Sequence, residues 1–254
     1  MYQVTPIPAF NDNYIWSIED LNNNNCILVD PGDATPVIEY LRRTGKTLSA
    51  VLLTHHHNDH IGGVSALQAK HPQLPIFGAK DPRIPATHAV KEGDTFTQGE
   101  LNFSVLEIPG HTSSHIGFYT RDWLFCGDTL FSAGCGRLFE GTPQQMRQSL
   151  DKLCQLPDNT QIFCTHEYTQ ANVNFALAVE PDNRVLQQYA SWVNAQRSAD
   201  KPTLPSQLGK EKAINPFLRS HVPEVIATAK TRSQMSHLSQ DDVFAEIRRW
   251  KDSF

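Results

Sequence analysis

A short histidine-rich segment directly after an apolar run is the feature that most constrains this chain. The run Ser49–Leu53 has the length and composition of a buried strand. The next residues, Thr54 to His60, read Thr-His-His-His-Asn-Asp-His, and Gly62 and Gly63 then open a helical pattern. We therefore predict a strand, a loop that carries the histidines and a helix. Such strand ends are where α/β proteins place their chemical groups.

The residue types in this segment predict a metal site. Imidazole nitrogen and carboxylate oxygen suit Zn, Fe and Mn. Residues two apart on an extended loop can face the same way, so His55 and His57 can share one ion while Asp59 and His60 serve a second. The alternative is a surface loop that binds metal only adventitiously. It is disfavoured because closely packed imidazoles repel one another when protonated, unless a cation keeps them neutral.

Three further strand-like runs each end in one residue of a metal-binding type. These residues and the runs before them are His111 after Leu101–Ile108, Asp128 after Trp123–Cys126, and His166 after Gln161–Cys164. Taken singly, each residue is more often a hydrogen-bonded loop residue than a ligand. Together with the first segment they form a consistent set of donors at four strand ends.

These residues resemble the metallo-β-lactamase superfamily and, within it, the glyoxalase II (hydroxyacylglutathione hydrolase) family. The segments that carry the narrower resemblance are Phe10–Tyr14, Gly127–Phe131, Gly134–Arg137 and Thr165–Thr169. The resemblance covers essentially the whole chain. It implies an α/β fold, an αββα sandwich, followed by a small all-helical C-terminal domain. We expect the catalytic domain to span residues 1–170 and the helical domain, which would complete the glutathione site, to span residues 171–254.

The resemblance also implies a site for two divalent metal ions, with Zn favoured and Fe or Mn as alternatives. The implied ligands are His55, His57 and His111 for the first ion, Asp59, His60 and His166 for the second, and Asp128 as a bridge between them. A hydroxide that bridges the two metals would be the nucleophile. Asp59 and Asp128 would be the catalytic carboxylates.

A glutathione site is implied at five further positions: Arg137, Phe139, Tyr168, Arg248 and Lys251. Phe139 departs from the tyrosine of eukaryotic members, and the missing hydroxyl removes one hydrogen bond worth ~1 kcal/mol. Arg248 and Lys251 are three residues apart, so they share one helix face. The alternative for this pair is a basic helix end that complements the helix dipole.

The activity that the resemblance implies is hydrolysis of S-2-hydroxyacylglutathione, typically S-D-lactoylglutathione, to glutathione and D-lactate. This is the second step of glutathione-dependent methylglyoxal detoxification. Alternatives are a lactonase, β-lactamase, nuclease or persulfide dioxygenase of the superfamily, and a non-catalytic metal-binding protein on the same fold. A complete second ligand set argues against a dioxygenase with one iron, and lactonases and lactamases would not need a basic C-terminal segment.

Composition limits the remaining function classes. The net charge of −5 predicts no general affinity for nucleic acid. We find neither an apolar run near the ~20 residues of a membrane span nor a secretory signal. Five cysteines, an odd number without a Cys-x-x-Cys pair, indicate a reducing compartment. We therefore expect a cytoplasmic monomer that acts on a small molecule, with Cys126 and Cys164 as buried thiols or, alternatively, soft metal ligands.

Helix start and stop signals complete the picture. Thr35 is expected to cap a helix that has Pro36 at its first helical position and ends at Gly45. A second such helix is expected to begin at Thr142–Pro143. After residue 171 the strand pattern stops, and the predicted helices are 171–179, 183–197, 223–231 and 240–251, the last with a Ser239-x-x-Asp242 capping box.

Overall fold

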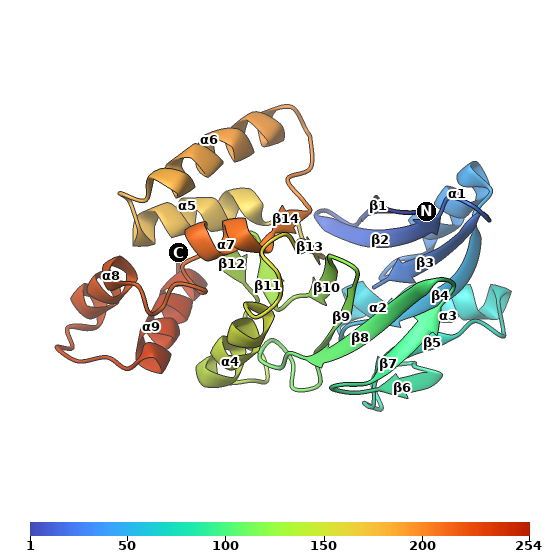
Figure 1. Ribbon diagram of the computed structural model, residues 1–254, viewed down its shortest axis with the longest axis horizontal. Coiled ribbons are helices and arrows are strands. Elements are labelled where there is room, and N and C mark those ends of the chain that lie inside the picture. Colours follow the sequence, from blue (N-terminus) through green and yellow to red (C-terminus); the bar gives the residue numbers. More distant parts are fainter. The chain divides into compact units, whose positions relative to one another are not determined.

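The computed structural model describes all 254 residues, Met1–Phe254. The chain divides into two compact units, each of which is described by itself (Figure 1). The first unit contains residues 1–107 and 114–127, and the second contains residues 108–113 and 128–254. No helix is long and apolar enough to cross a membrane.

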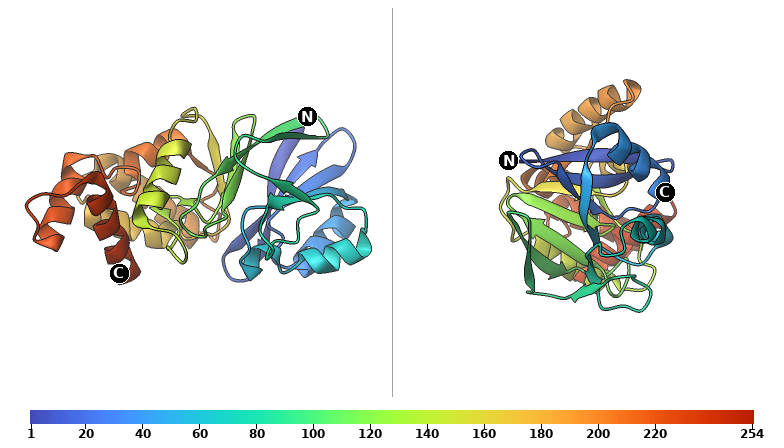
Figure 2. Two further views of the ribbon diagram at one scale, coloured as in Figure 1. Left: turned by 90° about the horizontal axis from the view of Figure 1, so that it is seen from below. Right: turned by 90° about the vertical axis from the view of Figure 1, so that its right-hand side faces the viewer.

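A six-stranded mixed sheet forms one layer of the first unit. Its strands, in spatial order, are β1 (Tyr2–Ala9), β2 (Asn13–Asp20), β3 (Asn25–Val29), β4 (Thr47–Leu53), β5 (Ile76–Ala79) and β6 (His88–Val90). The first three strands are antiparallel and the last four are parallel. The parallel strands are joined through α1 (Ala34–Thr44) and α3 (Val64–Lys70), which contact each other (Figure 2). Right-handed crossovers that advance in one direction place both helices on the same face of the sheet.

An antiparallel meander forms the second layer of the first unit. Its strands are β7 (Thr95–Gln98), β8 (Leu101–Glu107), β9 (Ile116–Thr120) and β10 (Trp123–Gly127). The two layers meet through stacked aromatic rings, because the Phe96 ring lies 4.0 Å from that of Phe77 and 5.2 Å from that of Phe103. The buried faces of these strands therefore make the core that supports the strand ends.

The cap of α1 differs from the prediction. Asp33, and not Thr35, is the N-cap residue, and its carboxylate accepts the hydrogen bond of the Thr35 backbone N–H. Both residue types favour this position, and the helix begins earlier than the Pro36 signal indicated. The predicted end is confirmed, since Gly45 adopts the left-handed conformation with φ of 68°.

The second unit contains a small hairpin, a strand pair and most of the helices. The hairpin is β11 (Leu130–Phe131) with β12 (Gly134–Cys135), and β13 (Gln161–Cys164) pairs with β14 (Ser206–Gln207). The helices are α4 (Pro143–Leu153), α5 (Thr169–Val179), α6 (Arg184–Ser198), α7 (Leu208–Ile214), α8 (Pro223–Ser233) and α9 (Gln240–Asp252). The capping boxes at Thr142 and Ser239 are both present.

The four helices predicted after residue 171 are confirmed, whereas β14 and α7 were not predicted. Both elements are short, and α7 begins at Gln207, whose side chain makes no capping hydrogen bond. The usual start signal is therefore absent from the sequence. The predicted domain boundary after residue 170 falls inside the second unit and stays a prediction.

Candidate metal centre

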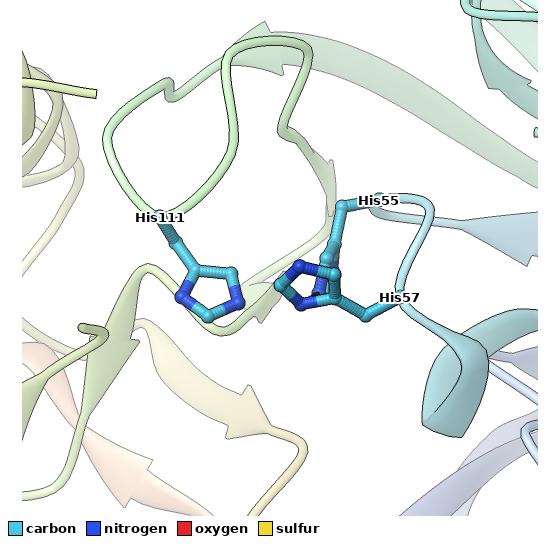
Figure 3. A group of neighbouring side chains, drawn as sticks. All are labelled: His55, His57 and His111. Atoms are coloured by element: carbon cyan, nitrogen blue, oxygen red, sulfur yellow. Dashed lines mark hydrogen bonds between the residues drawn. The ribbon is translucent and has the colours of Figure 1, made fainter. Parts of the chain in front are cut away.

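Strand β4 delivers the histidine-rich segment of the first unit to its end. The loop is shorter than predicted, because Asp59 and His60 lie in a one-turn helix, α2 (Asn58–Ile61), with His57 at its N-cap. The Gly62 N–H donates to the Asn58 carbonyl at 2.7 Å and closes this turn. Figure 3 shows the His55 and His57 rings, which leave the loop before the helix begins.

The first donor set, His55, His57, Asp59 and His60, is packed closely enough to bind ions. His55 Nε2 lies 3.1 Å from His57 Nδ1. The donor atoms of His55 and His60, and those of Asp59 and His60, lie within 4.8 Å of one another. His55 and His60 are fully buried and their ring centroids are only 4.0 Å apart. Two protonated imidazoles at that distance would repel each other, so this set fits a divalent cation.

Asp30 is not among the candidate residues identified from the sequence, but its hydrogen bonds hold this set in place. It follows β3 and its buried carboxylate accepts hydrogen bonds from the Thr54 N–H at 2.8 Å and the Thr54 hydroxyl at 2.7 Å. His60 Nδ1 lies 3.0 Å from the same carboxylate. Because a carboxylate only accepts, this contact places the proton on Nδ1 and leaves Nε2 as a metal donor. An acidic residue at a strand end before Pro-Gly is the signal that could have identified it.

Asp59 is positioned by two close approaches. The Asn13 side chain donates to Asp59 Oδ2 at 3.1 Å. A Cβ atom on Gly32 would lie 1.8 Å from the Asp59 carbonyl oxygen, so only glycine permits the loop after β3 to pass so close to α2. The Asp59 side chain remains 40% exposed. It can therefore meet both an ion and a molecule that comes from solvent.

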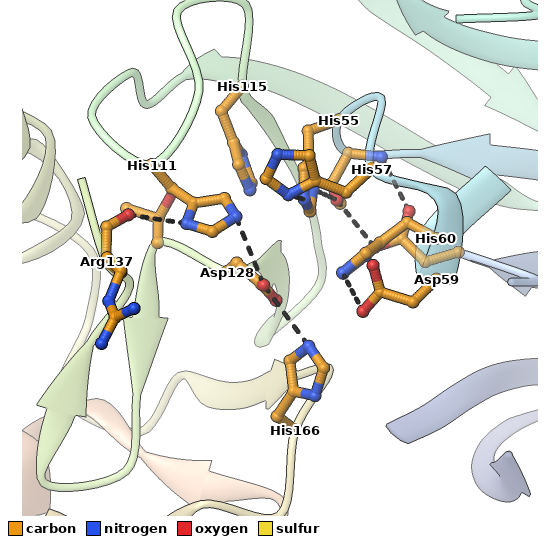
Figure 4. Close-up of polar contacts among 12 residues, drawn as sticks. His55, His57, Asp59, His60, His111, His115, Asp128, Arg137 and His166 are labelled. Carbon is orange, nitrogen blue, oxygen red and sulfur yellow. Dashed lines mark hydrogen bonds and ion pairs between the residues drawn. The ribbon is translucent and has the colours of Figure 1, made fainter. Parts of the chain in front are cut away.

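The second donor set, His111, Asp128 and His166, lies in the second unit. Asp128 Oδ2 is 3.4 Å from His111 Nε2 and 3.4 Å from His166 Nε2 (Figure 4). His111 Nδ1 lies 2.8 Å from the Arg137 carbonyl oxygen, which accepts a hydrogen bond from Nδ1 and leaves Nε2 to face Asp128. One carboxylate oxygen therefore lies between two imidazole nitrogens of a metal-binding type.

Aromatic side chains flank the imidazoles of the second set. The Tyr168 ring stacks on His166 at 4.6 Å with an interplanar angle of 4°, and Phe131 meets His166 edge-on at 5.9 Å. Phe139 meets His111 edge-on at 5.3 Å and is 60% exposed. Two of the predicted substrate-binding residues, Phe139 and Tyr168, therefore lie beside predicted metal ligands and are open to solvent.

The three predicted cationic substrate residues gather around α9. Arg248 is buried, donates from Nη1 to the Cys135 carbonyl at 2.9 Å and from Nη2 to Asp252 at 3.0 Å. The exposed Arg137 lies 3.4 Å from the same carboxylate. Burial and then the charge of Arg248 lower the pKa of Lys251 from its ordinary value of 10.5. An anion bound beside Lys251 would oppose both effects, so this cluster is suited to a carboxylate ligand.

His115 is buried in the first unit. Its ring stacks on that of His55 at 4.6 Å, and its Nδ1 lies 3.1 Å from the Ile116 carbonyl oxygen. None of the five cysteines forms a disulfide, and Cys126 and Cys164 are buried.

Two family models match the chain. The metallo-β-lactamase superfamily matches residues 11–166, and the C-terminal region of hydroxyacylglutathione hydrolase matches residues 167–254. The hydroxyacylglutathione hydrolase of Vibrio campbellii is 53% identical over 256 residues, which cover 100% of both chains. That of Idiomarina loihiensis is 52% identical over 252 residues, or 99% of each chain.

A solved structure shows the same fold. ETHE1 from Myxococcus xanthus superposes with a TM-score of 0.69 at 24% identity, over 98% of this chain and 90% of that one. Together with the family models, this likeness confirms the predicted αββα sandwich followed by a helical C-terminal region. The fold and the His and Asp donors together support the binding of divalent metal ions.

Proposed function

Since the chain belongs to the hydroxyacylglutathione hydrolase family, we propose that it hydrolyses the thioester of S-2-hydroxyacylglutathione to glutathione and a 2-hydroxy acid. The typical substrate is S-D-lactoylglutathione and the acid is D-lactate, as in methylglyoxal detoxification. The observation that carries the proposal is identity of 52–53% to named hydroxyacylglutathione hydrolases over the whole chain.

In the proposed site the two donor sets bind two divalent ions, and Zn suits their imidazole and carboxylate donors best, with Fe and Mn as alternatives. The proposed ligands are His55, His57 and His111 for one ion, Asp59, His60 and His166 for the other, and Asp128 for both. Two hydrogen bonds support this assignment of ligands, because Asp30 and the Arg137 carbonyl fix the tautomers of His60 and His111.

Divalent ions bound there would supply an activated water and stabilise negative charge on the thioester oxygen. The protein's own residues hold the reactants. Asp59, which Asn13 orients, would accept a hydrogen bond from the attacking water and direct it at the carbonyl carbon. The thiol of glutathione has a pKa of about 8.5, so its thiolate is a stable leaving group that departs without a strong general acid.

The tripeptide supplies binding energy away from the reacting carbonyl. Tyr168 and Phe139 offer exposed aromatic faces beside His166 and His111. Lys251, Arg137 and Arg248 form the cationic end of the site, which suits a glutathione carboxylate. Arg248 is buried, and its guanidinium is already hydrogen-bonded to Cys135 and Asp252. It therefore contributes its positive charge to this end of the site.

We also propose that the enzyme is a cytoplasmic monomer. None of the five cysteines forms a disulfide and four of them are buried, which fits a reducing compartment. Light scattering of the purified protein would test the monomer, and a dimer mass would contradict it.

The decisive experiment compares kcat/KM for S-D-lactoylglutathione with that for the D-lactoyl thioester of N-acetylcysteamine, a small uncharged thiol. We expect a strong preference for the glutathione ester, because only it meets the cationic end of the site. Equal, slow turnover of both esters would leave a general metallohydrolase, such as a lactonase, as the better description.

A further inference from the structure

A buried carboxylate in the second unit lies outside the ligand set. Glu211, on α7, has no exposed surface. Its Oε1 accepts hydrogen bonds from the hydroxyls of Ser132, at 2.8 Å, and Ser206, and its Oε2 accepts from the Ala133 N–H at 2.7 Å and the Asn215 amide at 3.2 Å. All four donors are neutral groups.

Such a residue is costly to bury, and that cost points to a specific task. Removing a carboxyl group from water is unfavourable unless its hydrogen bonds are complete, and an apolar residue of similar size is often no less stabilising. Burial accordingly raises the pKa of Glu211. The task is indicated by its partners, because Ser132 and Ala133 form the turn of the β11–β12 hairpin.

Two asparagine side chains also hydrogen-bond to the backbone of this hairpin. The Asn215 amide donates to the carbonyls of Phe131 at 3.1 Å and Gly134 at 2.9 Å. The Asn172 amide, from α5, donates to the Ser132 carbonyl at 3.1 Å. Ala133 has a φ of 54°, which lies in the left-handed region and is uncommon for a residue with a Cβ atom. These bonds keep the turn in a conformation that it would not otherwise favour.

The hairpin connects two parts of the second donor set. Asp128 lies two residues before β11, and Arg137, whose carbonyl oxygen accepts from His111 Nδ1, lies two residues after β12. The ends are in contact, because the Gly136 N–H donates to the Thr129 carbonyl at 3.2 Å and a Cβ on Gly136 would lie 1.9 Å from the Asp128 carbonyl oxygen. A shift of the turn would therefore move the Arg137 carbonyl relative to His111.

We infer that Glu211 is a positioning residue for the metal centre. It fixes the β11–β12 hairpin so that the Arg137 carbonyl keeps the proton of His111 on Nδ1 and Nε2 directed at Asp128 and the ion. This inference rests on the proposed function, since it assigns His111 and Asp128 as ligands. Helix α7 contributes no metal ligand. Through Glu211 it nevertheless affects the metal affinity of the second set.

The test is Glu211→Gln, with Glu180→Gln as the matched control. Glu180 is also a buried carboxylate of the second unit, but it is held by Arg219 through two 2.8 Å bonds at the end of α5. Zn affinity would be measured by competition with a chromophoric chelator, beside kcat, KM and the thermal midpoint. We expect Glu211→Gln to lose about 10–100-fold in affinity for at least one ion, with KM within about twofold. Glu180→Gln should lower only the midpoint.

A second variant covers the case in which Glu211→Gln does not fold. Asn215→Ala removes the bonds to Phe131 and Gly134 and should weaken Zn binding about fivefold, the effect of ~1 kcal/mol. A lower midpoint with wild-type Zn affinity in both variants would show a purely structural role and overturn the inference. Wild-type protein that neither binds Zn nor hydrolyses the glutathione ester would overturn the proposed function, and this inference with it.

Discussion

The two donor sets of this protein are built in different ways. The first set lies within six consecutive residues after one strand, and the second draws His111, Asp128 and His166 from three separate strand ends. A side-chain carboxylate, Asp30, supports His60 in the first set, whereas a backbone carbonyl, that of Arg137, supports His111 in the second. The first arrangement is local, and the second depends on how a hairpin is held.

This difference has a consequence for mutation. Support from a side chain can be removed by one substitution at the supporting residue itself. Support from a carbonyl oxygen survives any side-chain change at its own residue, and it is lost only when the backbone moves. The first set should therefore be sensitive near the strand end, and the second should be sensitive at residues that hold the hairpin.

The largest expected effect is that of Asp128→Ala, which removes the only carboxylate of the second set. We expect the protein to lose at least one ion and kcat to fall roughly a thousandfold, because a bridging anion holds both ions. Elemental analysis and steady-state kinetics would measure this, with the exposed Asp122→Ala as control. Two ions per chain in Asp128→Ala would refute the bridging role.

Asp30→Asn tests the local set in the same way. The amide has one acceptor oxygen in place of two, so it cannot accept from both the Thr54 N–H and His60 Nδ1, and we expect metal affinity to fall about 10–100-fold. Asp33→Asn is the control in the same loop, because asparagine caps α1 as well as aspartate. Chelator competition measures both. Wild-type metal affinity in Asp30→Asn would contradict this prediction, because it would show that the Asp30 carboxylate does not support metal binding by the first set.

Lys251 allows a test of the substrate end through pH. Its lowered pKa means that its charge is lost on the alkaline side, at a lower pH than for an ordinary lysine with a pKa of 10.5. KM for the glutathione ester should therefore rise as pH is raised toward 10. Lys251→Ala should raise KM about 10-fold or more at neutral pH, the effect of one charge-assisted hydrogen bond.

The control for this prediction is Lys251→Arg. Arginine stays charged at these pH values, so KM of this variant should be independent of pH over the range in which the wild type changes. The same alkaline rise in both proteins would assign it to another group.

The smallest expected effect concerns the stability of α9. Ser239→Ala removes the hydroxyl that accepts from the Asp242 N–H at 3.2 Å and should lower the free energy of unfolding by ~1 kcal/mol. Urea unfolding measures this, beside Ser198→Ala at the exposed end of α6 as control. We expect metal affinity to remain unchanged. A loss of affinity would mean that the second set depends on α9 as well as on the hairpin.

The sequence predicted what is encoded locally. The donors from His55 to His60 could be identified because they are close together in the sequence. Helices α6, α8 and α9 could be identified because a capping residue or a proline marks each start. The ligand and substrate roles come from the family resemblance, and they stay predictions that the experiments above address.

What escaped prediction depends on contacts between distant residues. Asp30 reaches Thr54 and His60 because β3 and β4 pair in parallel, and the Asp30 N–H donates to the Leu52 carbonyl at 2.9 Å. Glu211 belongs to a short helix without a start signal, and a buried carboxylate contradicts the usual pattern of polar residues at the surface. Neither environment can be read from neighbouring residues.

The equal distances from Asp128 Oδ2 to His111 and His166 also bear on how the protein would fill with metal. On the proposed assignment, the first ion to arrive orders a carboxylate that the second ion also needs. The second ion then meets a donor whose freedom has already been lost, so it binds more favourably. This ordering of the shared carboxylate would favour loading of the two ions together, against the repulsion between two divalent cations.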